Sequence, residues 1–182
     1  GYESLELTGA GYQTYEPETD LTTYAKDQNY WALKDGFRID FGAKFAGAKA
    51  IAQAEQSDDP TAVLGDTLEN MVLHNMELSL KDDGFLNRAI NAYAAQSGQD
   101  PQELRNQLTG MLAMAPMMAA GSGIDPELLT EASTALSSFV SDPKTLTIKM
   151  APAEPLVMQT IAEMEDPSAL TKEALGFSAT NE

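Results

Sequence analysis

The sequence predicts an α+β fold in which an antiparallel meander sheet has one face covered by several helices. Two observations indicate this fold. Every predicted strand alternates apolar and polar residues, which is typical of antiparallel strands with one buried and one solvated face. The apolar period then becomes helical near Gly47, so that strands come first and helices dominate afterwards. We expect a single domain over residues 1–182, with a β-meander part over 1–47 and a helix-rich part over 48–182.

The β-meander part opens with short strands and ends in a long hairpin. The short strands are expected at Leu5 to Leu7, Tyr12 to Tyr15 and Leu21 to Ala25, and the hairpin strands at Asn29 to Leu33 and Phe37 to Phe45. A three-residue hairpin loop over 34–36 pairs Trp31 with Ile39 and places both apolar sets on one face, whereas a two-residue Asp-Gly loop would bring Trp31 opposite Asp40. We therefore predict the longer loop, with Gly36 in the left-handed conformation and Trp31 in the sheet core.

The helix-rich part contains predicted strands near residues 71–80, 145–150 and 177–180. In the first of these, one face is expected to carry Val72, His74, Met76, Leu78 and Leu80. Helices are predicted over Phe85 to Ser97, from Pro101 to about Ala115, from Pro126 to Phe139 and from Pro155 to Met164. Three stretches share an order of acidic residue, proline, helix and strand, which leaves an internal duplication open.

Seven of the nine prolines follow an acidic residue, and this pairing marks the architecture. An aspartate at the N-cap accepts a hydrogen bond from a free N–H group, and a proline at N1 has no N–H group to leave unpaired. We predict helix starts at Asp59, Asp100, Asp125, Glu154 and Asp166. Glu16-Pro17 is instead predicted to form a turn, and Asp142-Pro143 to lead into a strand.

Composition excludes several classes of function. The chain has 28 acidic and 11 basic residues and a formal charge of −17, which disfavours nucleic acid as a partner. Cysteine is absent, so thiolate metal sites and cysteine nucleophiles are excluded. No apolar run is long enough for a membrane span. Because the chain starts at Gly1-Tyr2 without a methionine, we expect a fragment of a longer chain.

The candidate catalytic residues all have simpler structural interpretations. His74 is the only histidine, and no motif places a carboxylate or nucleophile beside it, so we interpret it as a structural residue. Asp82-Asp83-Gly84 lacks the ligand series of a calcium loop and is predicted to be a strand-to-helix turn. Acidic pairs suited to a hydrolase are too abundant to indicate one without geometry. We expect no enzymatic activity, no cofactor and no metal.

The methionine-rich segment over 111–118 is the candidate binding element. Leu104, Leu108, Met111, Ala115 and Met118 follow a helical stripe, and Pro116 is expected to kink or end the helix. This stripe favours a core helix. The alternative is an apolar ligand or partner surface, because methionine adapts to irregular apolar partners; its residues would be Leu108, Met111, Met114 and Met118.

Several segments carry a resemblance to a known group of proteins. They are LSLKDDGFLNRA over 78–89, GQDPQELR over 98–105, Phe139 with DPKTLTI over 142–148, and APAEPL over 151–156. They resemble the C-terminal part of uncharacterised exported proteins of Gram-negative bacteria over roughly residues 70–180. The strands before residue 47 are similar to repeats in AsmA-like envelope proteins. The resemblance implies a periplasmic setting and no defined activity.

Two main hypotheses for function follow. The first is a non-enzymatic structural or interaction domain of a bacterial envelope protein, whose partner is the rest of a longer chain or another envelope protein. The second is a domain that binds a lipid or another apolar ligand between the sheet and the helices around Met111 to Met118. A hydrolase that uses acidic residues is a third hypothesis, and it would require clustered carboxylates in a deep cleft.

Overall fold

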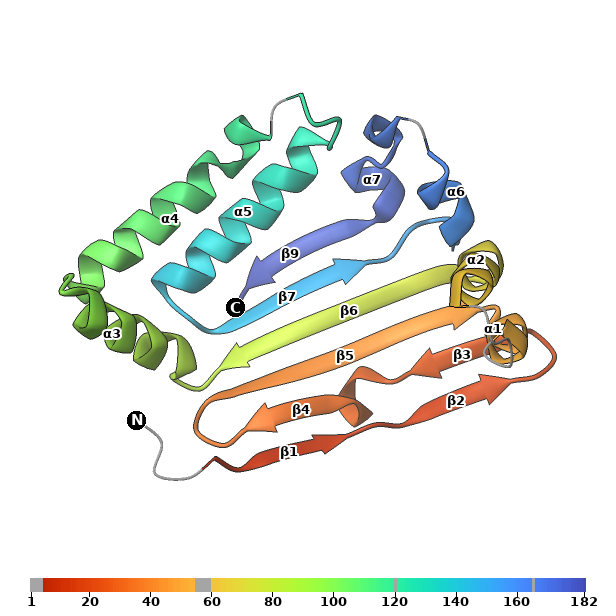
Figure 1. Cartoon of the computed structure of the whole chain (residues 1–182), viewed down its shortest axis with the longest axis horizontal. Coiled ribbons are helices and arrows are strands. Elements are labelled where there is room, and N and C mark those ends of the chain that lie inside the picture. The colour runs from red at the N-terminus through yellow and green to blue at the C-terminus, as the bar shows by residue number, and fades with distance from the viewer. Residues whose placement is uncertain (1–4, 55–59, 120, 165) are drawn as a thin grey trace.

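The computed structural model describes residues 5–54, 60–119, 121–164 and 166–182, and within these ranges its strands form one antiparallel sheet of nine strands. The order β1-β4-β5-β6-β7-β9 runs across the sheet, and β2, β3 and β8 extend it (Figure 1). The strands β4, β5, β6 and β7 are neighbours both along the chain and in the sheet, and the predicted antiparallel sheet and the α+β class are confirmed.

The N-terminal strands form one side of this sheet. They are β1 (Leu7–Ala10), β2 (Gln13–Glu16), β3 (Leu21–Tyr24), β4 (Tyr30–Leu33) and β5 (Phe37–Ala46). Both β3 and β4 pair with β5, and the 3-10 turn η1 (Lys26–Gln28) separates them. The hairpin prediction is confirmed, because Leu33 pairs with Phe37 and Trp31 with Ile39. The prediction for Gly36 was wrong: Asp35 takes the left-handed conformation, with φ of 55°.

The remaining strands complete the sheet on the other side. They are β6 (Val72–Asp82), β7 (Thr145–Met150), β8 (Leu156–Val157) and β9 (Phe177–Asn181). The predicted alternation holds from Met76 to Leu80 and fails at His74. Lys44 pairs with Asn75 while Phe45 pairs with Leu73, so His74 is the extra residue of a β-bulge. The bulge moves Leu73, rather than Val72, onto the apolar face beside Phe45.

All the α-helices in the described residues follow β5 and precede β9 along the chain. They are α1 (Ala48–Ala54), α2 (Pro60–Asn70), α3 (Phe85–Ser97), α4 (Pro101–Met118), α5 (Pro126–Ser141), α6 (Met158–Ala162) and α7 (Lys172–Leu175), with a 3-10 turn η2 (Pro167–Ala169) before α7. The change of period at Gly47 coincides with the end of β5 and the start of α1. Helix α5 packs on β7 and β9, and α4 packs on the outer side of α5 (Figure 1).

Capping explains three of the seven acid-proline pairs. Asp100 accepts hydrogen bonds from the N–H groups of Gln102 and Glu103, and Asp125 accepts one from Glu127, as expected for N-caps. Asp166 accepts from Ser168 at η2, a 3-10 turn rather than an α-helix. The cap predicted at Asp59 lies outside the described residues.

The predicted helix start at Glu154 was wrong. Leu156 and Val157 pair with β6 as strand β8, and α6 begins only at Met158, after Val157. Because β6 is longer than β7, its first residues need another partner, and β8 supplies it. Tertiary pairing therefore overrides the helical spacing of these apolar residues.

The core lies under α5. Ala135 and Phe139 from this helix pack against Leu146 of β7 and Ala179 of β9, and all four are buried. Leu80 and Ile148 extend the cluster across β6 and β7. The helix-covered face of the sheet is thus the apolar face of β6, β7 and β9.

An ion-pair cluster ties α7 to α5. Lys172 Nζ lies 2.6 Å from Glu131 Oε2, and the Lys172 backbone N–H donates to Asp125. Glu131 also accepts the N–H of Ala179 on edge strand β9. The hydrogen bond from the Lys172 ammonium and then the N–H of Ala179 hold the pKa of Glu131 below its ordinary value of 4.5. The N–H groups of Lys172 and Glu127 lower the pKa of Asp125 in the same way.

We expect stability to fall at acidic pH because of this cluster. A carboxylate whose pKa is lower in the folded state contributes stability above its unfolded pKa, and this contribution is lost as the pH falls through the folded pKa. The midpoint of thermal unfolding should therefore drop as the pH decreases below about 4.5. Glu131→Gln should flatten this acid dependence.

The matched control is Glu103→Gln, which removes an exposed carboxylate on α4. Thermal unfolding followed by circular dichroism at a series of pH values compares the three proteins. An acid limb as steep in Glu131→Gln as in the wild type would show that the cluster does not contribute.

Candidate apolar binding face

The helices cover only part of the apolar face of the sheet. One row of directly paired residues runs across four strands: Trp31 pairs with Ile39, Ile39 with Leu80, and Leu80 with Leu146. Along this row the exposed fraction falls from 63% at Trp31 to 7% at Leu146. In a second row, Phe41 and Leu78 are exposed to similar extents, 36% and 38%, while Ile148 is half-buried and Ala179 is buried. The helical cover of the apolar face therefore ends near β6.

Chain order explains this boundary. The long helices α3, α4 and α5 are inserted between β6 and β7; α5 folds back over β7 and β9, and α4 packs on α5. The connections between β1 and β5 are short turns, with only the 3-10 turn η1 among them. Apart from Phe37, which contacts Phe85 of α3, the apolar side chains toward the β1 edge of the sheet are consequently left without a helical layer. We call this uncovered part the open face, and define it by Leu7, Trp31, Leu33, Ile39 and Phe41.

Trp31 is held flat on the open face. Its partner across the strands is Gly9, and two atoms of the indole ring lie 3.7 Å from the position that a Cβ atom of Gly9 would occupy. The indole thus lies over the glycine backbone, as aromatic residues commonly do beside glycine in sheets. Its outer surface remains exposed, so the prediction of a core tryptophan was wrong although its register was right.

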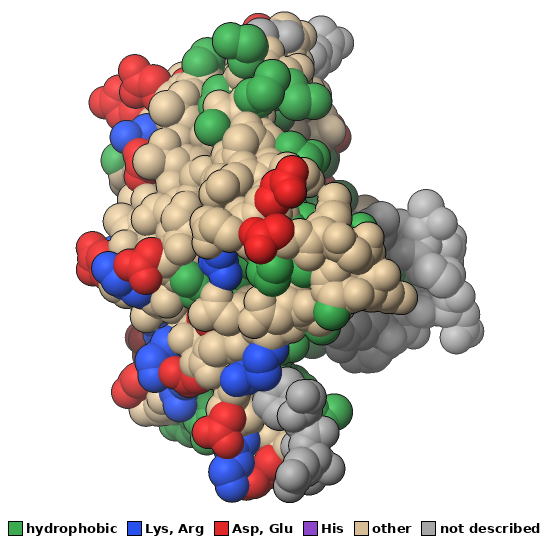
Figure 2. Space-filling model, turned by 90° about the vertical axis from the view of Figure 1, so that its left-hand side faces the viewer, with side chains coloured by type: hydrophobic (Ala, Val, Ile, Leu, Met, Phe, Trp, Pro, Cys, Tyr) green, Lys and Arg blue, Asp and Glu red, His purple; other side chains and the backbone are tan. Residues whose placement is uncertain are grey.

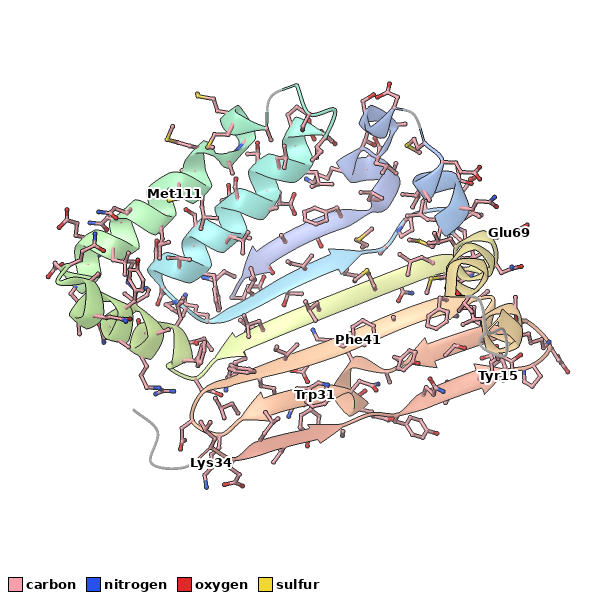
Figure 3. The ribbon with its side chains drawn as sticks, viewed as in Figure 1. Tyr15, Trp31, Lys34, Phe41, Glu69 and Met111 are labelled. Carbon is pink, nitrogen blue, oxygen red and sulfur yellow. The ribbon has the colours of Figure 1, made fainter. Side chains whose placement is uncertain are left out.

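An aromatic hollow lies where β3 and β4 separate. It has a volume of about 510 Å³, and its lining includes Trp31, Tyr24, Phe41 and the buried Asn29. The ring centroids of Tyr24 and Phe41 are 5.8 Å apart, so these two rings form one wall. Trp31 and Phe41 lie on neighbouring strands in Figure 3.

A second depression, the groove, lies where the open face meets the helices. Its volume is about 260 Å³, and it is lined by Phe37, Ile39, Leu80, Asp82, Phe85, Leu86 and Phe139. Phe37 and Phe85 contact each other edge to face, with centroids 5.3 Å apart. Ile39 belongs to both the groove and the open face. The two surfaces are therefore continuous.

The polar groups beside these depressions are already hydrogen-bonded. Asp82 accepts from the N–H groups of Gly84 and Leu86, each at 2.9 Å. Asn29 bonds the backbone of Tyr12 through both its amide oxygen and nitrogen. The two depressions therefore offer a ligand chiefly apolar contact.

The opposite face of the sheet is polar. Lys26 pairs with Glu77, and Arg38 binds Asp40 and lies 3.9 Å from the ring centre of Tyr30. Ser79 and Thr147 share a hydrogen bond of 2.9 Å. The two faces therefore differ sharply in chemistry, and only one suits an apolar ligand.

Helix α4, which carries the methionine-rich segment, does not lie in the core. Leu108 of α4 is half-buried, whereas Met111, Met114 and Met118 are exposed. Because α5 separates α4 from the strands, Met111 is far from Trp31 (Figure 3). The interpretation of this stripe as core is corrected for Met111 and Met118. Helix α4 continues through Pro116 and ends at Met118.

The candidate catalytic residues stay apart. His74 lies half-buried at the bulge of β6. Asp82 caps the turn into α3, where Gly84 has a φ of 96°, and Asp83 forms an ion pair with Lys81. Within the part of the chain that the structure describes, no three histidine or acidic side chains are grouped closely enough to hold a metal ion. None of the helices in these ranges has the length and apolar character to cross a membrane.

Comparison with known proteins identifies a family to which most of the chain is similar. Residues 30–182 match the model of a family described as "Uncharacterized protein". The chain belongs to this family. The match begins at the start of β4, so it includes Trp31 and the whole groove, while β1, β2 and β3 lie before it. Neither the curated proteins nor the solved structures gave a match.

Proposed function

We propose that this domain is a non-enzymatic binding domain of a bacterial envelope protein, and that its ligand is the acyl chain of a lipid. The observation that carries the proposal is the continuous apolar surface that runs from the groove onto the open face. The periplasmic setting rests on the resemblance of residues 70–180 to exported proteins. The binding site, in contrast with the sequence hypothesis, lies beside α3 and α5 rather than α4.

A hydrocarbon chain fits the chemistry of the groove. Its walls are the rings of Phe37, Phe85 and Phe139, and its polar neighbour Asp82 is engaged in capping α3. Recognition of a polar ligand needs directional hydrogen bonds, whereas an acyl chain needs only apolar contact and shape. A chain that enters the groove at Phe139 can continue past Ile39 to the flat ring of Trp31.

The net charge favours a neutral or zwitterionic head group. A chain with a formal charge of −17 repels a free carboxylate or a phosphate monoester. A phosphocholine head group carries no net charge and can remain in solvent at the open face. An apolar protein surface is the alternative partner for this face, because the open face is also broad and flat.

Calorimetric titration with dodecylphosphocholine below its micelle concentration tests the proposal. We expect saturable binding in the wild type. Ile39→Glu should weaken it at least about tenfold, because it places a charge where the groove joins the open face. Trp31→Glu is a second variant at a site exposed enough to tolerate the change.

Lys44→Glu is the matched control, since Lys44 lies on the polar face of the same strand, β5. Circular dichroism of each variant verifies that the fold is retained. Absence of saturable heat in the wild type, or equal affinity in wild type and both variants, would refute the acyl-chain site and favour a protein partner.

A further inference from the structure

The second half of α4 is apolar on all sides yet lies at the surface. Residues 111–118 read Met-Leu-Ala-Met-Ala-Pro-Met-Met. A helix that is apolar all round is normally buried in a protein core or in lipid. Here Met117 and Met118 are 76% and 78% exposed. Four exposed methionines, Met111, Met114, Met117 and Met118, define what we call the methionine tip.

The outer side of α4 changes character along its length. Its inner side packs on α5 through half-buried residues, among them Leu104, Leu108 and Ala115. The outer side begins with exposed polar residues, Gln102, Glu103, Asn106 and Gln107, and ends in the methionine tip. A helix that lay flat on a partner protein would show one uniform apolar stripe. The gradient instead suits a helix whose end enters an apolar phase.

No charge interrupts this region. Between Arg105 and Asp125 the sequence contains no acidic or basic residue and no histidine. Ile124, which is exposed, stands just before α5 at the same end of the two helices. Transfer of the tip from water to an apolar phase therefore requires no charged side chain to be desolvated. The tip also offers no ion pair to a charged partner.

The methionine tip lies at an extremity of the molecule. Helices α4 and α5 project together away from β6, and the end of α4 is at the top of Figure 1. Figure 2 views the molecule from the side of α3 and α4, and hydrophobic side chains gather at the upper end of this face. The hollow and the groove lie on the sheet, away from this end. The methionine tip therefore projects from the surface and does not line either of these two depressions.

We propose that the methionine tip inserts into the interface of a lipid bilayer with a neutral surface. Flexible methionine side chains adapt to a disordered apolar medium, and a helix end with an apolar surface enters the boundary between head groups and acyl chains. The formal charge of −17 opposes approach to an anionic surface, and the uncharged tip provides no local attraction to overcome it. Insertion does not depend on the acyl-chain site of the open face.

Co-flotation with phosphatidylcholine vesicles tests the inference. We expect the wild type to float with these vesicles, and to float less with vesicles that contain phosphatidylglycerol. Raising the ionic strength should leave binding to the neutral vesicles unchanged and restore binding to the anionic ones, because salt screens the repulsion. The double variant Met114→Glu/Met117→Glu should reduce the bound fraction at least about tenfold.

Tyr93→Glu is the matched control, because it alters an exposed aromatic residue of α3, outside the open face, and leaves α4 intact. It should float like the wild type. A second readout uses Met117→Trp in a Trp31→Phe background, where the emission of the only tryptophan should shift to shorter wavelength with vesicles and be quenched by brominated lipid. Wild-type protein that stays in the bottom fraction, flotation unaffected in the double variant, or unchanged emission overturns the proposal. The first outcome would point to a protein partner for the tip.

Discussion

Phe139→Ala is expected to lower the free energy of unfolding by about 3–5 kcal/mol, the range for removal of a buried aromatic ring. Phe139 is 6% exposed and packs on both β6 and β7 residues under α5. Trp31→Ala removes a larger side chain, from the uncovered part of the sheet face against which Phe139 packs. Its cost should be only about 1 kcal/mol or less, because most of the indole already contacts water.

Urea denaturation of the two variants measures this difference. The pair is informative because Phe139 is enclosed between α5 and the sheet, whereas Trp31 lies on the open face. Equal losses for Trp31→Ala and Phe139→Ala would mean that something covers the open face in solution. Repeating the measurement over a range of protein concentrations distinguishes cover by a second copy from cover within one chain.

Gly176→Ala should be among the most damaging single substitutions. Gly176 ends α7 with φ of 52°, and a Cβ atom there would lie 2.0 Å from the carbonyl oxygen of Ala151. Both atoms belong to backbone segments that fix the pairing of β7 with β9, and Ala151 donates its N–H to Gly176. We expect a loss of about 3 kcal/mol or more, since β9 must shift to relieve the clash.

Gly98→Ala is the matched control for this prediction. Gly98 also ends a helix, α3, in the left-handed conformation, with φ of 71°, but nothing lies within 4 Å of its Cβ position. Gly98→Ala should lower the free energy of unfolding by about 1 kcal/mol, the cost of placing alanine in the left-handed conformation. Similar denaturation midpoints for the two alanine variants would contradict the steric argument at Gly176.

The register of the hairpin was predictable because it depends on neighbouring residues. The apolar alternation of the hairpin fixes the pairing of Trp31 with Ile39, and the same logic places Met76, Leu78 and Leu80 on one face. The caps at Asp100 and Asp125 are equally local, since each side chain bonds N–H groups two or three residues ahead.

The remaining features depend on contacts that are distant in sequence. Alternation identifies which side chains share a face, but it does not say whether a helix covers that face, and Trp31 was misplaced for this reason. The lack of any helical segment between β1 and β5 was the available signal. The strand at Leu156–Val157 pairs with the start of β6, and the bulge at His74 shifts the pairing of β6 with β5; no local pattern reveals either feature.

The sequence predicted an apolar surface as the candidate site, but it did not predict the residues that line the groove. Methionine density pointed to an apolar surface, and the exposed Met111, Met114 and Met118 form such a surface. The groove of Phe37, Phe85 and Phe139 joins three elements, β5, α3 and α5, whose meeting follows from the packing of α5 on the sheet. Sequence spacing alone cannot bring these three rings together.

Fluorescence of Trp31 tests the open face most directly, because it is the only tryptophan of the chain and lies on that face. In the free protein, its emission should be that of a solvated indole and be readily quenched by acrylamide. Dodecylphosphocholine below its micelle concentration should shift the emission to shorter wavelength and protect it from the quencher. Emission that is already protected in the free protein, or that does not change when the detergent is added, would contradict an open apolar face that binds acyl chains.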